Sequence, residues 1–304
     1  MSWTAAEEPR CRTETCAEPV ELQIVPRARD LGGLEVRRVL PAAQRQMVGP
    51  FIFFDQMGPA DFEPGRGIDV RPHPHIGLAT VTYLFEGSIF HRDSLGSEEL
   101  IRPGDVNWMT AGRGIVHSER TDPETRRGGG RLSGIQSWVA LPQDQAETEP
   151  GFWHHPAASL PELDGEGVRL RLIAGHGFGR RSPVATASET LYADVTLQPG
   201  ARLEVPAEHE ERAVYLAEGD LEIDGERQGR GQMLVLRPGV ALTVGAPEGA
   251  RLMLLGGAVM DGPRFIWWNF VAASRERIEQ AKADWREGRF PPVPGDHERI
   301  PLPE

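Results

Sequence analysis

One short motif occurs twice in this chain of 304 residues, and the duplication limits the possible folds more than any other feature. The run Tyr83-Leu-Phe-Glu-Gly87 returns in the second half as Tyr215-Leu-Ala-Glu-Gly219. Each copy is followed by short apolar runs and by two glycines eight positions apart. These glycines are Gly104 and Gly112 after the first copy, and Gly231 and Gly239 after the second. Two matches in the same order indicate a tandem duplication of one unit.

The repeated unit is predicted to be a β-barrel. Runs of β-branched and aromatic residues, most of them closed by Gly, Pro or Asp, are typical of short strands joined by tight turns. With 35 glycines and 26 prolines, the chain has more turn residues than a helix bundle tolerates. We therefore predict an all-β fold of two barrels in tandem. The clearest predicted strands cover residues 34–40, 51–54, 78–85, 134–141, 168–173 and 191–197.

One short helix is predicted near the C-terminus. Ser274 can cap its first turn, because a serine side chain accepts hydrogen bonds from free backbone N–H groups. Ile278, Ala281 and Trp285 then share one face at helical spacing, and Gly288 can end the helix.

The chain length agrees with two domains of ordinary size. We expect the N-terminal barrel to occupy residues 1–145, and the C-terminal barrel with its helix to occupy residues 165–304. The segment 143–167, rich in Pro, Glu and Gly, is expected to connect them.

Net charge and hydropathy exclude several classes of protein. The formal net charge of −12 disfavours direct nucleic-acid binding, because contacts to phosphates require clustered cations, whereas it permits protein partners. The longest apolar stretch, residues 252–260, is far shorter than the ~20 residues of a membrane span. The N-terminus lacks the basic start and apolar core of a signal peptide. We therefore expect a cytoplasmic protein without a membrane partner.

The two cysteines, Cys11 and Cys16, exclude a four-thiolate zinc site and a disulfide framework. They could pair with each other, although free surface thiols are the favoured interpretation. The nine histidines are therefore the residues to examine for a metal site.

Two short motifs place metal-ligating residues at strand spacing. In His73-Pro-His75 and His117-Ser-Glu119, the ligating residues are two positions apart, so an extended strand projects each pair to one face. If the two strands are neighbours in a barrel, four groups converge on its interior. Three imidazoles and one carboxylate suit a divalent transition metal and leave room for water or substrate.

These motifs resemble those of the cupins, and more closely those of the pirin family of two-barrel cupins. The matching runs are His73-Pro-His75-Ile-Gly77, Val81-Thr-Tyr-Leu-Phe-Glu-Gly87 and Met109-Thr-Ala-Gly-Arg-Gly-Ile-Val-His117-Ser-Glu119. Further matches are Arg37-Arg-Val-Leu-Pro41, Phe53-Phe-Asp-Gln-Met-Gly58 and Phe265-Ile-Trp-Trp-Asn-Phe270. The resemblance implies two jelly-roll barrels, with His73, His75, His117 and Glu119 matching the pirin iron ligands.

The resemblance also implies the cofactor and the role of Glu119. The expected cofactor is one divalent transition metal, with Fe(II) favoured and Mn, Ni, Cu, Co or Zn as alternatives. The general cupin pattern often has a glutamate four residues after His75, where this chain has Ala79. Without a second carboxylate, Glu119 would serve both as metal ligand and as the catalytic general base.

The second half is expected to contain no metal site. The repeat aligns the four ligand positions with apolar residues, namely Val205, Ala207, Val244 and Ala246. The remaining histidines show no comparable spacing and are expected to be structural or exposed: His91, His154, His155, His176, His209 and His297.

Two classes of function follow from the resemblance. Some pirins resemble flavonol 2,3-dioxygenases, which implies a small aromatic substrate such as quercetin. Candidate walls for its flat rings are Phe53, Phe54, Trp108 and Met109, although core packing is the more common role of each such residue. The alternative is an iron-dependent, redox-sensing regulator that binds protein partners in transcription or metabolism without turnover.

Overall fold

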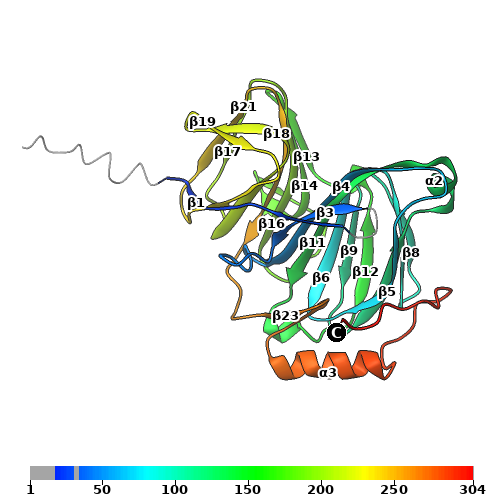
Figure 1. The fold of residues 1–304 in the computed structure, drawn as a ribbon. Helices are drawn as coiled ribbons and strands as arrows, with labels where there is room; N and C mark the ends of the chain where they lie inside the picture. Colours follow the sequence, from blue (N-terminus) through cyan, green and yellow to red (C-terminus); the bar gives the residue numbers. More distant parts are fainter. Residues whose placement is uncertain (1–17, 31–33, 304) are drawn as a thin grey trace, which may run out of the picture.

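Two β-barrels stand side by side in the computed structural model, which describes residues 18–30 and 34–303 (Figure 1). Cys11 and Cys16 lie outside the described residues, so their state stays a prediction. The predicted all-β fold with a short C-terminal helix is confirmed. Within the described part of the chain, no helix is long and apolar enough to span a membrane.

The first barrel combines a seven-stranded sheet with a four-stranded sheet. The larger sheet has the order β12 (Gly151–His155), β9 (Val106–Thr110), β6 (Leu78–Glu86), β11 (Gly130–Ala140), β4 (Phe51–Phe62), β3 (Glu35–Leu40) and β2 (Arg27–Asp30). The smaller sheet has the order β5 (Asp69–His75), β10 (Ile115–Arg120), β7 (Ile89–Asp93) and β8 (Glu98–Ile101). All strand pairs in both sheets are antiparallel, as short connections require.

The second barrel is formed by one sheet whose strands curl around an apolar interior. Its main path is β1 (Val20–Ile24), β20 (Met233–Leu236), β18 (Glu211–Ile223), β22 (Ala250–Gly257), β16 (Thr190–Leu197), β14 (Val168–Gly177) and β13 (Glu162–Gly165). Off this path are β15 (Arg180–Arg181), β17 (Ala201–Val205), β19 (Glu226–Gly229) and β21 (Leu242–Ala246).

The segment 143–167, expected to be a connection, contains two edge strands. β12 pairs with β9 of the first barrel, and β13 pairs with β14 of the second. The short helices η1 (Gln143–Gln145) and η2 (Ala157–Ser159) lie before and between them. Its Pro and Glu content concealed these strands, because an edge strand needs little apolar alternation.

A six-residue helix, α2 (Pro123–Gly128), was also not predicted. Asp122 caps it by accepting hydrogen bonds from the backbone N–H groups of Glu124 and Thr125. No residue of this helix is buried, so no apolar periodicity marks it in the sequence.

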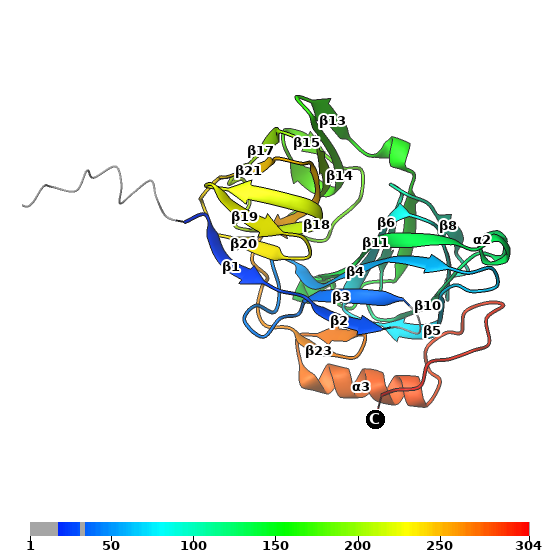
Figure 2. The same ribbon diagram turned by 45° about the horizontal axis from the view of Figure 1, so that its top comes forward.

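Segments at both ends of the described chain pack on the barrel that is distant in sequence. β1 joins the sheet of the second barrel before the chain continues into β2 and β3 of the first (Figure 2).

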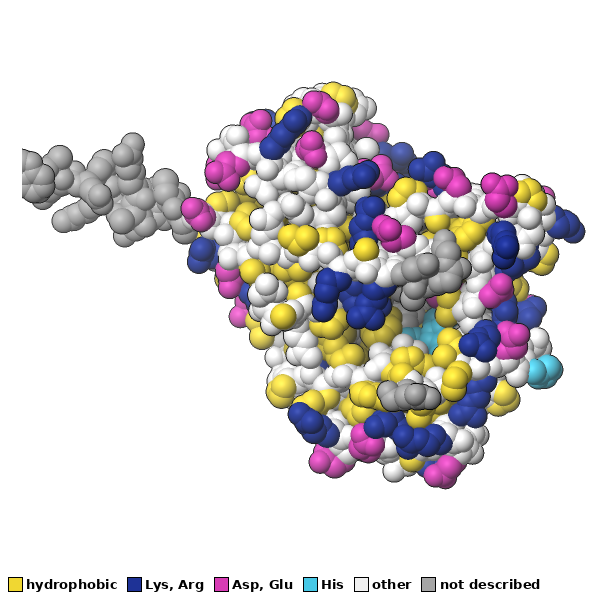
Figure 3. All heavy atoms as spheres, in the orientation of Figure 1, with side chains coloured by type: hydrophobic (Ala, Val, Ile, Leu, Met, Phe, Trp, Pro, Cys, Tyr) yellow, Lys and Arg dark blue, Asp and Glu magenta, His cyan; other side chains and the backbone are white. Residues whose placement is uncertain are grey.

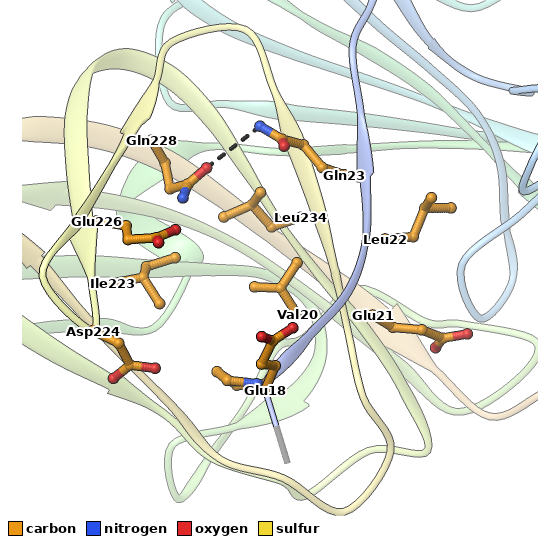
Figure 4. A pocket seen from close by; sticks show the side chains of 11 residues that line it. Glu18, Val20, Glu21, Leu22, Gln23, Ile223, Asp224, Glu226, Gln228 and Leu234 are labelled. Carbon is orange, nitrogen blue, oxygen red and sulfur yellow. Dashed lines mark hydrogen bonds between the residues drawn. The ribbon is translucent and has the colours of Figure 1, made fainter. Parts of the chain in front are cut away.

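A groove of about 400 Å³ lies beside β1, where Gln23 donates a hydrogen bond to Gln228 (Figure 4). Carboxylates of Glu18, Glu21, Asp224 and Glu226 line this groove.

The C-terminal segment covers the first barrel in the same way. The hairpin β23 (Phe265–Trp267) and β24 (Phe270–Ala272) and the helix α3 (Arg275–Arg286) lie under that barrel (Figure 1). The predicted cap and buried face of α3 are confirmed, since Ser274 accepts from Arg277 N–H and Ile278, Ala281 and Trp285 are buried. The N-terminal strand packs on the second barrel and the C-terminal segment packs on the first. The predicted domain limits, 1–145 and 165–304, therefore stay a prediction.

The two barrels share one buried core that includes all three tyrosines of the chain. Tyr83 of β6 donates a hydrogen bond to Asp194 of β16 over 2.8 Å, and Tyr215 of β18 donates to Gln56 of β4 over 2.6 Å. Burial of polar groups is tolerated only when they are hydrogen-bonded, so these contacts fix how the barrels meet.

Candidate metal centre

The two motifs that carry the predicted ligands lie on neighbouring strands. β5 and β10 pair antiparallel, with His73 opposite His117 and His75 opposite Ile115. β5 is the edge of its sheet, which explains how a strand can hold Pro72 and Pro74, since proline has no N–H to give to a second neighbour. The predicted convergence of the two motifs is confirmed.

Three histidines form a buried group at this position. Ligand atoms of His73, His75 and His117 all lie within 4.8 Å of one another. The three residues are 1–7% exposed. Burial lowers the pKa of His73 to about 4 and lowers the pKa of His75 and of His117 well below the ordinary value. All three rings are therefore neutral near pH 7, which is the form that binds a metal ion.

Backbone carbonyls determine which nitrogen faces the centre of the group in two of the three rings. The carbonyl of Arg71 lies 2.9 Å from His73 Nδ1, and the carbonyl of Asn269 lies 3.1 Å from His75 Nδ1. Because a carbonyl oxygen can only accept, both rings carry their proton on Nδ1 and keep a lone pair on Nε2. Asn269 belongs to the β23–β24 hairpin, so the C-terminal segment orients a residue of the first barrel.

Gly77 allows this hairpin to approach. Its φ angle of +67° is one that residues with a side chain rarely adopt. A Cβ atom at this position would also collide with the carbonyl oxygen of Val271 in β24. The glycine that follows the His73-Pro-His75 run is therefore needed to keep Asn269 against His75.

A fourth histidine, His91, continues the network behind His117. Asp93 Oδ2 lies 3.2 Å from His91 Nε2, and His91 Nδ1 lies 3.4 Å from His117 Nδ1. An ionised Asp93 accepts the Nε2 proton of His91, so His91 Nδ1 accepts the Nδ1 proton of His117. His117 then presents a lone pair on Nε2, only 3.1 Å from His75 Nε2. His91 was expected to be structural or exposed, without a partner geometry like that of the two motifs. The structure buries it beside His117, a contact that the β7–β10 pairing creates and that sequence spacing did not reveal.

Glu119 lies on the other side of His117. A β-bulge between His117 and Glu119 shifts the register, so Glu119 faces Val70 on β5. Its carboxylate groups with His91 and His117, with ligand atoms within 4.8 Å, and its Oε1 lies 3.1 Å from the Thr82 hydroxyl. Burial raises the pKa of Glu119. His117 thus belongs to two groups, and the assignment of His73, His75, His117 and Glu119 as one ligand set stays a prediction.

Aromatic side chains border the histidines on one side. Trp138 of β11 lies edge-on to His75, with ring centroids 5.2 Å apart, and stacks on Phe53 at 4.0 Å. Met109 belongs to the same apolar cluster, whereas Phe54 and Trp108 point into the core between the barrels. Trp138 was not predicted as a neighbour of His75, although it lies in the predicted strand 134–141.

The face of the first barrel that Figure 3 shows is hollowed. A histidine side chain is visible on the floor of this hollow, with hydrophobic and basic side chains around it. Next to the histidine group, the ring of Phe152 in β12 stacks on His91, with ring centroids 4.4 Å apart.

A second group lies in the other barrel. Ligand atoms of His176, Glu189 and His209 are within 4.8 Å of one another. This group was not predicted from the sequence, where His176 and His209 were expected to be structural or exposed. Of the four aligned positions, Val205, Val244 and Ala246 are buried as expected, and Ala207 is exposed.

Comparison with known proteins identifies relatives along almost the whole chain. Residues 33–139 match the family model described as Pirin, and residues 192–291 match the model of the Pirin C-terminal cupin domain. A Pirin-like protein of Caulobacter vibrioides is 52% identical over 289 residues, which cover 94% of this chain and 100% of the relative.

Two solved structures illustrate the similarity of the fold. A quercetin 2,3-dioxygenase from Acinetobacter baumannii superimposes with a TM-score of 0.86 at 32% identity, covering 93% of this chain and 95% of the other. A bacterial pirin from Escherichia coli in complex with nickel(II) has a TM-score of 0.62 at 18% identity, covering 79% of this chain and 99% of the other. The second similarity shows the fold alone.

Proposed function

The chain belongs to the pirin family of two-barrel cupins, and from this premise we propose that its first barrel binds one divalent transition-metal ion and oxygenates a flavonol in the manner of a quercetin 2,3-dioxygenase. One observation carries the proposal. His75 Nε2 and His117 Nε2 lie 3.1 Å apart, and the hydrogen bonds of both rings leave no proton between these atoms. Two lone pairs at this distance repel each other unless a cation lies between them.

The donor set fits a metal such as Fe(II). His73, His75 and His117 would supply three neutral imidazoles, and Glu119 would supply one carboxylate after its side chain turns towards them. Fe(II) is favoured by the family resemblance, and Mn, Ni, Cu, Co or Zn would accept the same nitrogen and oxygen ligands. When bound, the ion supplies Lewis acidity and the redox chemistry needed for reaction with dioxygen.

The surrounding side chains would bind and activate the substrate. Trp138 and Phe53 offer apolar ring faces beside His75, where the flat rings of a flavonol can stack. Glu119 would take the proton of the 3-hydroxyl group, because its carboxylate lies beside the histidines, with ligand atoms of His91 and His117 within 4.8 Å. The reaction consumes one flavonol and one dioxygen and releases the ring-opened ester and one carbon monoxide.

An oxygen-electrode experiment tests this proposal. Metal-free protein is reloaded with each candidate metal in turn and mixed with quercetin, and oxygen uptake is compared with the loss of flavonol absorbance. We expect equal rates of both, and no uptake with a flavone that lacks the 3-hydroxyl. The absence of uptake with every metal and flavonol tested would refute the enzymatic proposal and leave the redox-sensing regulator as the alternative.

Variants of two glutamates connect the activity to this site. Glu119→Gln keeps an oxygen ligand but removes the base, so turnover should fall ~10²–10⁴-fold while some metal remains bound. Glu248→Gln is the matched control, because Glu248 is exposed on the second barrel and pairs with Arg227. Equal activity of the two variants would exclude Glu119 as the base.

A further inference from the structure

We propose that His176, Glu189 and His209 form a second site for a divalent transition-metal ion, in the C-terminal barrel. His176 lies near the end of β14, Glu189 directly precedes β16, and His209 lies two residues before β18. β14 and β16 are neighbours in the sheet, and β22 lies between β16 and β18. Ligand atoms of the three side chains lie within 4.8 Å of one another. This site is separate from the proposed oxygenase centre and does not depend on it.

The hydrogen bonds of His209 determine which of its nitrogens can bind an ion. His209 is almost fully buried, and its Nε2 lies 2.9 Å from the backbone carbonyl oxygen of His176. Because that oxygen can only accept, Nε2 carries a proton and donates it. A neutral His209 therefore has its lone pair on Nδ1.

Nδ1 of His209 faces a carboxylate oxygen. It lies 2.7 Å from Glu189 Oε1, so two electron-rich atoms approach within hydrogen-bond distance. The contact requires a proton or a cation between these atoms, which can be a proton on His209 or on Glu189, or a metal ion. A metal-binding histidine commonly donates its second N–H to a backbone carbonyl, as His209 does here.

The side chain of His176 favours the metal ion. Its ring lies 4.6 Å from the ring of His209, centroid to centroid, and is half-buried beside the same carboxylate. A simple ion pair between Glu189 and a protonated His209 does not need this third donor. Two imidazoles and one carboxylate select Zn²⁺, Ni²⁺ or Cu²⁺ over Mg²⁺ and Ca²⁺, which prefer oxygen ligands.

The site is open to solvent and would connect three parts of the barrel. The side chain of Glu189 is 43% exposed, so an ion can enter and keep water as a further ligand. A bound ion would hold the end of β14 against the segments that precede β16 and β18. Because the ion binds the folded chain, it should also raise the melting temperature.

Zn²⁺ titration of a variant that lacks the first centre tests the proposal. His117 belongs to both described ligand groups of the first barrel, so His117→Ala disrupts both. Isothermal titration calorimetry of this variant near neutral pH should still show one Zn²⁺ per chain. Adding His176→Gln or Glu189→Gln should weaken this binding by at least ~100-fold, since loss of an outer-sphere partner alone costs ~10–100-fold.

Two controls make the outcome decisive. His297→Gln alters an exposed histidine distant in sequence from the group and should leave the affinity unchanged. Zn²⁺ bound by Cys11 and Cys16 would survive His176→Gln, so that variant assigns the ion to the proposed site. If His117→Ala does not fold, the count in the otherwise unchanged protein should fall from two to one with His176→Gln. Absence of Zn²⁺ binding in folded His117→Ala, or binding that His176→Gln and Glu189→Gln do not alter, would overturn the proposal.

Discussion

Replacing Asp93 with asparagine should weaken metal binding in the first barrel without unfolding it. Asp93 is fully buried. Burial acts to raise the pKa of Asp93, but hydrogen bonds from His91 and from the backbone N–H of Ser97 lower it below the ordinary value. The ionised carboxylate is therefore the acceptor that fixes the proton of His91 on Nε2, and through His91 the proton of His117 on Nδ1.

Asparagine has nearly the same shape but can present an N–H group where the carboxylate presented an oxygen. With Oδ1 retained by the N–H groups of Leu95 and Ser97, the new amide nitrogen would face His91 Nε2. His91 would then have to carry its proton on Nδ1, which leaves His117 with its proton on Nε2, the atom that should bind the metal. Loss of such an outer-sphere partner costs ~10–100-fold in metal affinity, or about 1.4–2.8 kcal/mol.

The assay is competition for Zn²⁺ with a chromophoric chelator, in a His176→Gln background that removes the second proposed site. Asp194→Asn is the matched control, because Asp194 is also buried and accepts from Tyr83 and Arg251 between the barrels. It should lower the melting temperature and leave the Zn²⁺ affinity unchanged. Wild-type affinity in Asp93→Asn, or an equal loss in Asp194→Asn, would refute the proposed chain of hydrogen bonds.

Three further predictions address the ligands and the stability of the first barrel. His75→Ala should abolish stoichiometric metal binding there while the circular dichroism spectrum stays that of a β protein, because large apolar cores stabilise the barrels; an unchanged metal content would contradict the ligand assignment. The free energy of unfolding of metal-free protein should fall by up to about 3 kcal/mol through His73 as the pH drops from 6.5 towards 4. The cause is that the unfolded chain takes up a proton at a pKa of ~6.5, whereas folded His73 accepts it only at a pKa of about 4. Denaturant unfolding at a series of pH values should show this dependence, and His73→Gln should reduce it. Trp285→Ala should lower the free energy of unfolding by ~3–5 kcal/mol, since this buried ring anchors α3 and donates to the carbonyl of Ile300, and a loss below ~1 kcal/mol would show that α3 contributes little.

Local patterns in the sequence were sufficient for most of the architecture. The predicted strands and the helix that Ser274 caps depend on residues close in sequence, so periodicity and capping reveal them. The pairing of His73 with His117 was predictable because both strands carry ligands at a spacing of two. The edge strand β12 was missed because nothing local separates it from a loop.

The rest of the site depends on contacts between distant segments. Asn269 orients His75 from a hairpin almost two hundred positions away, and Trp138 reaches His75 from a different sheet. His91 looked isolated because His117 and Glu119, which lie beside it, belong to β10, and the sequence does not specify the pairing of β10 with β7. The group around His209 was missed for the same reason, since its three members come from three separate segments.

Anomalous diffraction from crystals of metal-loaded protein, collected at the absorption edge of the metal, would locate the ion and identify its ligands. We expect one strong peak in the first barrel, surrounded by nitrogens of His73, His75 and His117 and an oxygen of Glu119 at ~2.0–2.2 Å, as for a zinc-sized divalent ion. An anomalous map with no peak among these four side chains, while the ion occupies only the group around His209 or no site at all, would contradict the account.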